Sequence, residues 1–270
     1  MKQLQIVRTL GELIDTIDKL NQKEVLWYRG HENKDWELIP SVQRPEFAGR
    51  EQYLANDFYM KASVTLLTKP DYRNYSAWLS IMRHYGLPTR LLDWSRSPLI
   101  AAYFATQNWE REEYGDGCIW ILSPSKLNAE EGFQEYLYSI DSHTALQMIR
   151  PAFKKEYVPE NERVINKILA CYPIEHDMRI YLQQSAFTLH NTERKLVDIE
   201  QEGLLQNIII PQKAKKRIAY ELNIMGITLS HVYPDAQNIA AELVLRNQMI
   251  EKREQENAER KEKEHDGTTV

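Results

Sequence analysis

Apolar residues recur along the chain at two spacings, and each spacing predicts a different kind of element. Helical spacing predicts helices over 9–22, 50–68, 75–84, 99–108, 213–224 and 235–245. Short β-prone apolar runs predict strands at 4–7, 25–31, 36–42, 89–92, 118–122, 186–189, 208–210 and 226–228. Together these elements predict an α+β fold: a single domain in which a small mixed, largely antiparallel sheet is flanked by several helices.

The pattern changes at Glu251, where Glu, Lys, Arg and Gln replace almost every apolar residue. A segment of this kind has too few apolar side chains to bury. We therefore expect residues 1–250 to form one domain and residues 251–270 to form an exposed charged helix that frays into disorder. The chain shows no internal repeat and no linker rich in Pro, Gly or Ser.

Composition narrows the class of protein. The chain has 270 residues, of which 43% are hydrophobic, and this is enough for a sizeable core. A net charge of −5 argues against broad nonspecific binding of nucleic acid, although it leaves room for a local basic cleft. Two cysteines and seven scattered histidines show no metal-ligand spacing, so no metal is indicated. No signal sequence and no membrane-spanning run is evident, which favours a cytoplasmic location.

The segment 84–95 places charges where a core segment would carry apolar residues. Arg90 and Asp93 stand among Leu91, Leu92 and Trp94. If the segment is buried, both charges need partners, because an unpaired charge is costly to bury. The partners are either each other or a ligand, and the sequence leaves both readings open.

Two further segments carry unusual polar groups. Arg29 ends a β-prone run and is followed by Gly30, an arrangement that presents a guanidinium to a phosphate or carboxylate. A structural ion pair with an Asp or Glu is the alternative. In the third segment, 178–190, a helix that ends near Gln183 or Gln184 would deliver an amide to the start of a strand. Amides recognise hydrogen-bonding groups but cannot act as bases. Motifs of serine hydrolases and P-loop proteins are absent from the sequence.

These three segments together resemble the FRG domain family. Residues 27–31 (WYRGH) resemble the motif for which the family is named, with Tyr28 in place of Phe. Residues 84–95 and 97–105 are similar to its longest block, and residues 179–188 resemble its third block, with Ser185 where Gly is usual. The resemblance extends from about residue 25 to about residue 245. It implies a bacterial, phage-associated family, some of whose members occur in mobile-element or anti-phage contexts.

A weaker similarity concerns the ADP-ribosyltransferases and implies an ADP-ribosyltransferase-like fold. Those enzymes place an Arg or His on an early strand, then a Ser/Thr strand followed by a helix, and later a Glu before another strand. Arg29, the segment 89–105 and Gln184 stand in the same order. The similarity implies that Arg29 binds the pyrophosphate of NAD and that Trp94 or Tyr103 stacks on nicotinamide. Gln184 departs from the pattern, so Asp93 is the substitute carboxylate.

The resulting hypothesis is an NAD-using, ADP-ribosyltransferase-like toxin or anti-phage effector, with NAD as substrate. Its catalytic residues are Arg29, Asp93 and Gln184. The residues expected to bind the nucleotide are Tyr28, Gly30, Thr89, Arg90, Trp94, Ser95, Tyr103 and Gln183. One alternative is a non-catalytic module that uses the same pocket to recognise a nucleotide, a nucleic acid or a protein, including an antitoxin-like or defence partner. A third reading is a buried charge network that only stabilises the fold.

Overall fold

The computed structural model describes residues 2–20, 24–154, 165–174 and 177–248. Within these residues eight strands form one sheet. The strands are β1 (Lys2–Ile6), β2 (Trp27–His31), β3 (Leu91–Ser95), β4 (Gly117–Leu122), β5 (Tyr138–Ser139), β6 (Ile168–Tyr172), β7 (Ser185–His190) and β8 (Leu205–Ile210).

Helices surround this sheet. They are α1 (Leu10–Leu20), α2 (Glu51–Thr65), α3 (Tyr75–His84), α4 (Pro98–Thr106), α5 (Pro124–Glu130), α6 (His143–Ile149), α7 (Met178–Leu182), α8 (Gln212–Ile224) and α9 (Leu229–Val232). Residues 236–248 form a further helix. None of the helices in the described part of the chain is long and apolar enough to cross a membrane. The tail expected over 251–270 lies outside the described residues.

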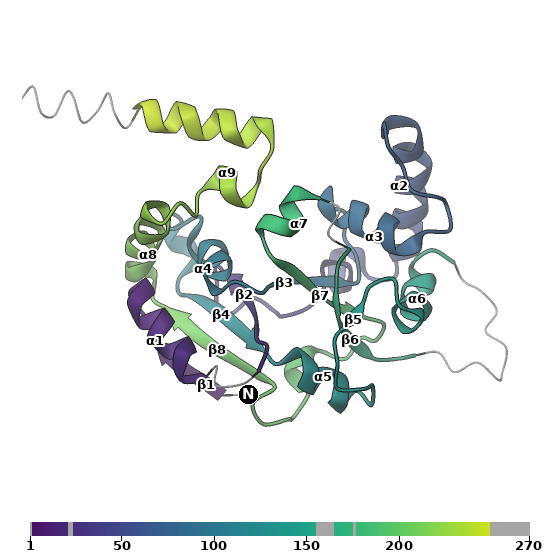
Figure 1. Cartoon of the computed structure of the whole chain (residues 1–270), viewed down its shortest axis with the longest axis horizontal. Helices are drawn as coiled ribbons and strands as arrows, with labels where there is room; N and C mark the ends of the chain where they lie inside the picture. Colours follow the sequence, from purple (N-terminus) through teal and green to yellow (C-terminus); the bar gives the residue numbers. More distant parts are fainter. Residues whose placement is uncertain (1, 21–23, 155–164, 175–176, 249–270) are drawn as a thin grey trace, which may run out of the picture.

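The strand order in the sheet is β1-β8-β4-β2-β3-β7-β6-β5 (Figure 1). The two pairs at the edges, β1–β8 and β6–β5, are parallel and the other pairs are antiparallel. The mixed, largely antiparallel sheet flanked by helices is thus confirmed, and it has more strands than the small sheet expected. The predicted strands at 36–42 and 226–228 are wrong, since these residues form turns and irregular backbone with one 3-10 turn.

The sheet is divided at its centre. β2 and β3 share a single register pair, Tyr28 with Ser95. By contrast, β2 is registered with β4 from Trp27 to His31, and β3 is registered with β7 along its whole length. Two half-sheets therefore meet at one end of β2 and β3 and diverge from there. The diverging residues include Arg29 on β2 and Asp93 on β3, and both line a cleft.

Three apolar clusters hold the half-sheets and helices together. One packs α1, α4 and α8 against β2, β4 and β8, and a second fills the opposite face of the sheet beneath α5. The third packs α2, α3 and α6 against β3, β6 and β7. All six residues of β4 are buried because this strand is covered on both faces, which explains its continuous apolar sequence.

Candidate functional site

A cleft of about 290 Å³ opens where β2 and β3 diverge. Its walls come from the end of α3, from α4 and from α7, and Tyr233 lies at its edge. Charged and aromatic side chains dominate the lining. The charged ones are Arg29, Glu32, Glu37, Arg44, Arg83, Asp93 and Arg179, and the aromatic ones include Tyr28, Trp36, Phe104, Phe187 and Tyr233.

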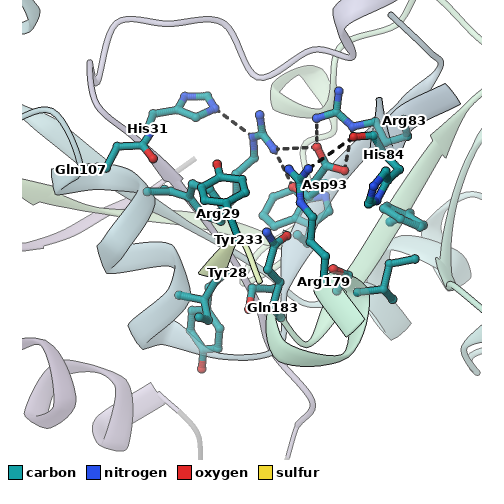
Figure 2. A pocket seen from close by; sticks show the side chains of 18 of the residues that line it. Tyr28, Arg29, His31, Arg83, His84, Asp93, Gln107, Arg179, Gln183 and Tyr233 are labelled. Carbon is teal, nitrogen blue, oxygen red and sulfur yellow. Dashed lines mark hydrogen bonds and ion pairs between the residues drawn. The ribbon is translucent and has the colours of Figure 1, made fainter. Parts of the chain in front are cut away.

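Asp93 lies at the centre of the charged groups (Figure 2). Arg83 Nε donates to Asp93 Oδ1 at 2.9 Å, and Arg83 Nη2 contacts Oδ2. Arg29 Nη1 lies 3.8 Å from Oδ2 and donates to the main-chain oxygen of Asp93 at 2.7 Å. Burial raises the pKa of Asp93, but the charges of Arg83 and Arg29 outweigh this effect and hold the pKa below its usual value. Asp93 is therefore a fixed carboxylate.

Arg29 is held on its other side by His31. Arg29 Nε donates to His31 Nε2 at 3.0 Å, while Trp120 Nε1 lies 3.3 Å from His31 Nδ1. Burial and the charge of Arg29 lower the pKa of His31 to about 3, so the imidazole is neutral. A neutral imidazole accepts through one nitrogen, and the shorter contact assigns that role to Nε2. His31 thus orients Arg29 toward the cleft.

Two more arginines add positive charge to the cleft. The Arg179 guanidinium lies 4.6 Å from the centre of the Tyr233 ring, and its Nη1 donates to the main-chain oxygen of His84 at 3.3 Å. Arg44 is exposed at the cleft edge and forms no ion pair among the described residues. Four guanidiniums therefore line the cleft together with three carboxylates: Arg83 and Arg29 contact Asp93, the charge of Arg179 acts on it, and Arg44 lies in the same lining. This excess of positive charge and N–H donors suits an anion.

Gly30 is required for packing. A Cβ atom built at this position would lie 1.9 Å from the carbonyl oxygen of Ala101 and 2.6 Å from the nitrogen of Ala105. Because no side chain fits there, α4 can lie directly on β2 and form one wall of the cleft. The Arg-Gly pair thus combines a cation for the cleft with close contact between strand and helix.

The structure brings seven of the residues proposed from sequence to the cleft and leaves four outside its lining. Those in the lining are Tyr28, Arg29, Gly30, Asp93, Trp94, Ser95 and Gln183, and those outside are Thr89, Arg90, Tyr103 and Gln184. Trp94 is buried and its Nε1 donates to Thr188 Oγ1 at 3.1 Å, so its ring is committed to the core.

Arg90 lies in a separate, sealed network. Its Nε and Nη2 donate to the carboxylate of Glu51, and its Nη1 donates to the main-chain oxygen of Met148 and to Asn191 Oδ1. Arg90 is 8% exposed, and every guanidinium nitrogen has an acceptor. Thr89 beside it is buried and its Oγ1 accepts from the nitrogen of Leu91. The structural interpretation therefore holds for this pair.

Gln183 and Gln184 have different environments. Gln183 Nε2 donates to the main-chain oxygen of Val232 at 2.9 Å, and its main-chain oxygen accepts from Ser95 Oγ at 2.7 Å. Gln184 is exposed and has a φ of 47°, a left-handed conformation that allows the tight turn from α7 into β7. Tyr103 packs against the cluster of α1, α4 and α8.

Sequence reasoning missed several residues of the cleft. Arg83 and His84 end α3, and the helix dipole alone was a sufficient reason for cations at that position. Arg179 and Tyr233 reach the cleft from segments far from β2 and β3, so only the folded chain brings them there. Arg83 directly precedes the second sequence block, and Arg179 is the first residue of the third. These positions are the signal that could have identified them.

Comparison with family models supports the assignment that the sequence blocks suggest. Residues 24–114 match the model of the FRG domain. The chain carries an FRG domain. The matched part of the FRG domain contains β2, α3, β3 and α4, and with them Arg29, Arg83 and Asp93. Comparison with curated proteins and with solved structures found no match. No group of three or more potential metal ligands occurs among the residues that the structure describes.

Proposed function

We propose that the cleft of the FRG domain binds a phosphorylated nucleotide, with NAD as the candidate that the ADP-ribosyltransferase resemblance names. The arginine cluster around Asp93 carries this proposal. Arg83 is occupied by Asp93, whereas Arg29, Arg44 and Arg179 keep N–H groups that no described acceptor uses. Guanidiniums bind phosphate oxygens with charge-assisted hydrogen bonds, and several arginines in one cleft suit a diphosphate.

The remaining lining favours a nucleotide over a simple inorganic anion. Trp36, Phe104 and Tyr233 contribute aromatic surface to the same cleft. Bases and nicotinamide rings stack on such surfaces. The volume of about 290 Å³ lies at the lower end of the range for small-molecule sites, which fits part of a dinucleotide in an open cleft.

The order of the three sequence blocks in space supports a relationship to the ADP-ribosyltransferases. Arg29 lies on β2, β3 leads into α4, and Gln184 precedes β7. These three strands are neighbours in the sheet, so Arg29, Asp93 and Gln183, which are far apart in sequence, line one cleft, while Gln184 lies outside it. This is the order that the resemblance implies for an NAD site.

The chemistry of the cleft favours recognition over cleavage of NAD. Asp93 is already paired with Arg83 and Arg29, and this leaves the carboxylate poorly suited to stabilise a developing positive charge. Gln184 is uncharged and lies outside the cleft lining. Binding without turnover is therefore the function that the geometry supports best. A toxin or anti-phage role would then rest on the ligand or partner that the domain recognises.

The proposal includes a cytoplasmic location. Cys118 and Cys171 are free, buried thiols, as is usual for proteins of reducing compartments. Burial raises the pKa of each thiol to about 12, so neither is reactive near neutral pH.

The test is a ligand series on the full chain. The thermal unfolding temperature is measured with NAD, ADP-ribose, ADP, AMP and inorganic phosphate, and NAD is assayed for consumption in parallel. We expect stabilisation by the nucleotides, weaker stabilisation by phosphate, and no loss of NAD. No stabilisation by any nucleotide would contradict the proposal. Consumption of NAD by the wild type and not by Arg29→Gln would establish the enzymatic alternative.

A further inference from the structure

Glu32 directly follows β2 and differs from the other acids that line the cleft. It is 5% exposed and lines the cleft. Asn108 Nδ2 donates to Glu32 Oε1 at 2.7 Å. Its second oxygen, Oε2, has no hydrogen-bond partner among the described residues, and it remains within reach of solvent although the side chain as a whole is nearly buried. An unpaired carboxylate oxygen that solvent reaches, on a residue that lines the cleft, is an acceptor that a bound ligand can use.

The other acids of the cleft are already engaged. Asp93 pairs with Arg83 and Arg29, and Glu37 pairs with Lys195 at the surface. Within the described lining, Glu32 is thus the acid that forms no ion pair through its carboxylate. It is the acceptor that remains for a ligand bound by the arginines.

The backbone of Glu32 is fixed by a buried lysine. Lys215 on α8 is 1% exposed, and its Nζ donates to the main-chain oxygen of Glu32 at 2.6 Å. Burial lowers the pKa of Lys215, and the negative charge of Glu32 opposes that effect. Asn108 beyond α4 and Lys215 on α8 therefore hold both ends of the residue, and a site held in this way loses little entropy on binding.

We propose that Glu32 accepts hydrogen bonds from the ribose hydroxyls of the nucleotide, so that the cleft selects ribonucleotides over 2′-deoxyribonucleotides. This inference rests on the proposed function. A carboxylate is purely an acceptor and pairs with hydroxyl or amine donors. The surroundings favour neutral hydroxyls over a cationic amine, because two cations are already nearby. Lys215 donates to the main-chain oxygen of Glu32, and Arg29 donates to His31, the residue before Glu32.

The size of the selectivity follows from the cost of an unpaired polar group. A bound nucleotide excludes water from Oε2, and a deoxyribose then leaves this oxygen without a donor; such a loss costs about 1–3 kcal/mol, or roughly ten- to a hundredfold in affinity. We therefore expect the wild type to bind ADP at least about tenfold more tightly than 2′-deoxy-ADP.

The experiment is calorimetric titration of the full chain with ADP and with 2′-deoxy-ADP. The variant Glu32→Gln replaces one carboxylate oxygen by a donor, so the preference for ADP should fall to about threefold or less. Glu110→Gln, an exposed acid just beyond α4, is the matched control and should keep the wild-type preference. Circular dichroism spectra verify that each variant is folded. The wild-type comparison needs no variant, so a destabilised Glu32→Gln protein does not remove the test.

The outcomes separate the two proposals. If nucleotides bind and the wild type does not distinguish ADP from 2′-deoxy-ADP, the ribose assignment is wrong and the proposed function stands. The same holds if Glu32→Gln keeps the full preference. If no nucleotide binds, both proposals are wrong. A preference that disappears only in Glu32→Gln supports the assignment.

Discussion

Arg90, just before β3, and Asp93, on β3, have similar sequence neighbours but belong to two charge networks with different roles. Arg90 and Asp93 are three residues apart, and both are surrounded by apolar neighbours in the sequence. Arg90 lies in a sealed network in which Glu51, Met148 and Asn191 use all of its guanidinium nitrogens. Asp93 lies in an open cleft among arginines that keep free donors.

The two networks differ in the number of hydrogen-bond acceptors that surround their guanidiniums. A buried guanidinium is tolerated when every N–H has a partner, and Arg90 meets this condition from α2, α6 and the end of β7. Around Asp93 there are more donors than acceptors, because this carboxylate pairs with Arg83 and Arg29 while Arg179 and Arg44 also line the cleft. A charged residue in an apolar segment therefore indicates a site only when its network is left incomplete.

The largest effect is expected from opening the sealed network. Glu51→Ala leaves Arg90 buried without its carboxylate, which should lower the free energy of unfolding by about 3–5 kcal/mol. Denaturant unfolding measures this loss. Asp57→Ala, which removes an ion pair with Lys61 from the exposed side of the same helix, is the control and should change stability little. Equal losses in the two variants would show that Arg90 is not the buried structural cation described here.

The second largest effect is expected when the pH is lowered, because the stability of the folded chain then depends on His31 in the cleft. His31 has a pKa of about 3 in the folded chain and about 6.5 when unfolded, so below pH 6.5 the unfolded state binds a proton that the folded state does not. The contribution of His31 to the free energy of unfolding is therefore fully present above pH 6.5. It falls by about 1.4 kcal/mol per pH unit as the pH decreases toward 3. Urea unfolding between pH 7 and pH 5 measures the slope.

The variant His31→Gln should reduce that slope by the equivalent of one proton. His143→Gln changes an exposed histidine and should leave the slope unchanged. A slope that is the same in the wild type and in His31→Gln would mean that His31 is not held neutral beside Arg29.

A smaller effect is expected from removing one free donor of the cleft. Arg44→Gln should weaken the binding of ADP about tenfold, because a charge-assisted contact to phosphate contributes on the order of 1.4 kcal/mol. Its stability should change little, since Arg44 is exposed. Arg50→Gln, an equally exposed arginine outside the cleft lining, should bind ADP as the wild type does. Equal binding by Arg44→Gln would exclude Arg44 from the site.

The smallest effect is an increase in affinity. Asp93→Asn removes the negative charge that competes with the ligand for Arg83 and Arg29, so ADP should bind about fivefold more tightly, by roughly 1 kcal/mol. The titration is made at a temperature where the variant gives the far-ultraviolet spectrum of the wild type. Weaker binding would instead place Asp93 in direct contact with the ligand.

Much of the fold could be predicted because its elements carry clear periodic signals. The helix predicted over 75–84 matches the bounds of α3, and the apolar run at 118–122 is the centre of β4. Trp36–Val42 looked like a strand because its apolar residues alternate, but Pro40 and the buried side chains of Leu38, Ile39 and Val42 pack there without a sheet partner. Packing contacts cannot be read from periodicity alone.

The site could be predicted only in part. Arg29 and Asp93 were proposed from their unusual positions, and the structure places both in one cleft. Arg90 had the same signal in sequence, and only the distant residues Glu51, Met148 and Asn191 show that it is sealed. Arg179 and Tyr233 enter the cleft through tertiary structure; Arg179 lies in the third sequence block, whereas the residues around Tyr233 in the sequence give no sign of a ligand.

The central claim is that free guanidinium donors around Asp93 bind the phosphates of a nucleotide. Calorimetric titration of ADP-ribose into the full chain and into Arg179→Gln tests it most directly, with the exposed Arg73→Gln as control. We expect saturable binding by the wild type and by Arg73→Gln, and binding at least about tenfold weaker by Arg179→Gln. No binding by the wild type, or equal affinity in Arg179→Gln, would contradict the claim.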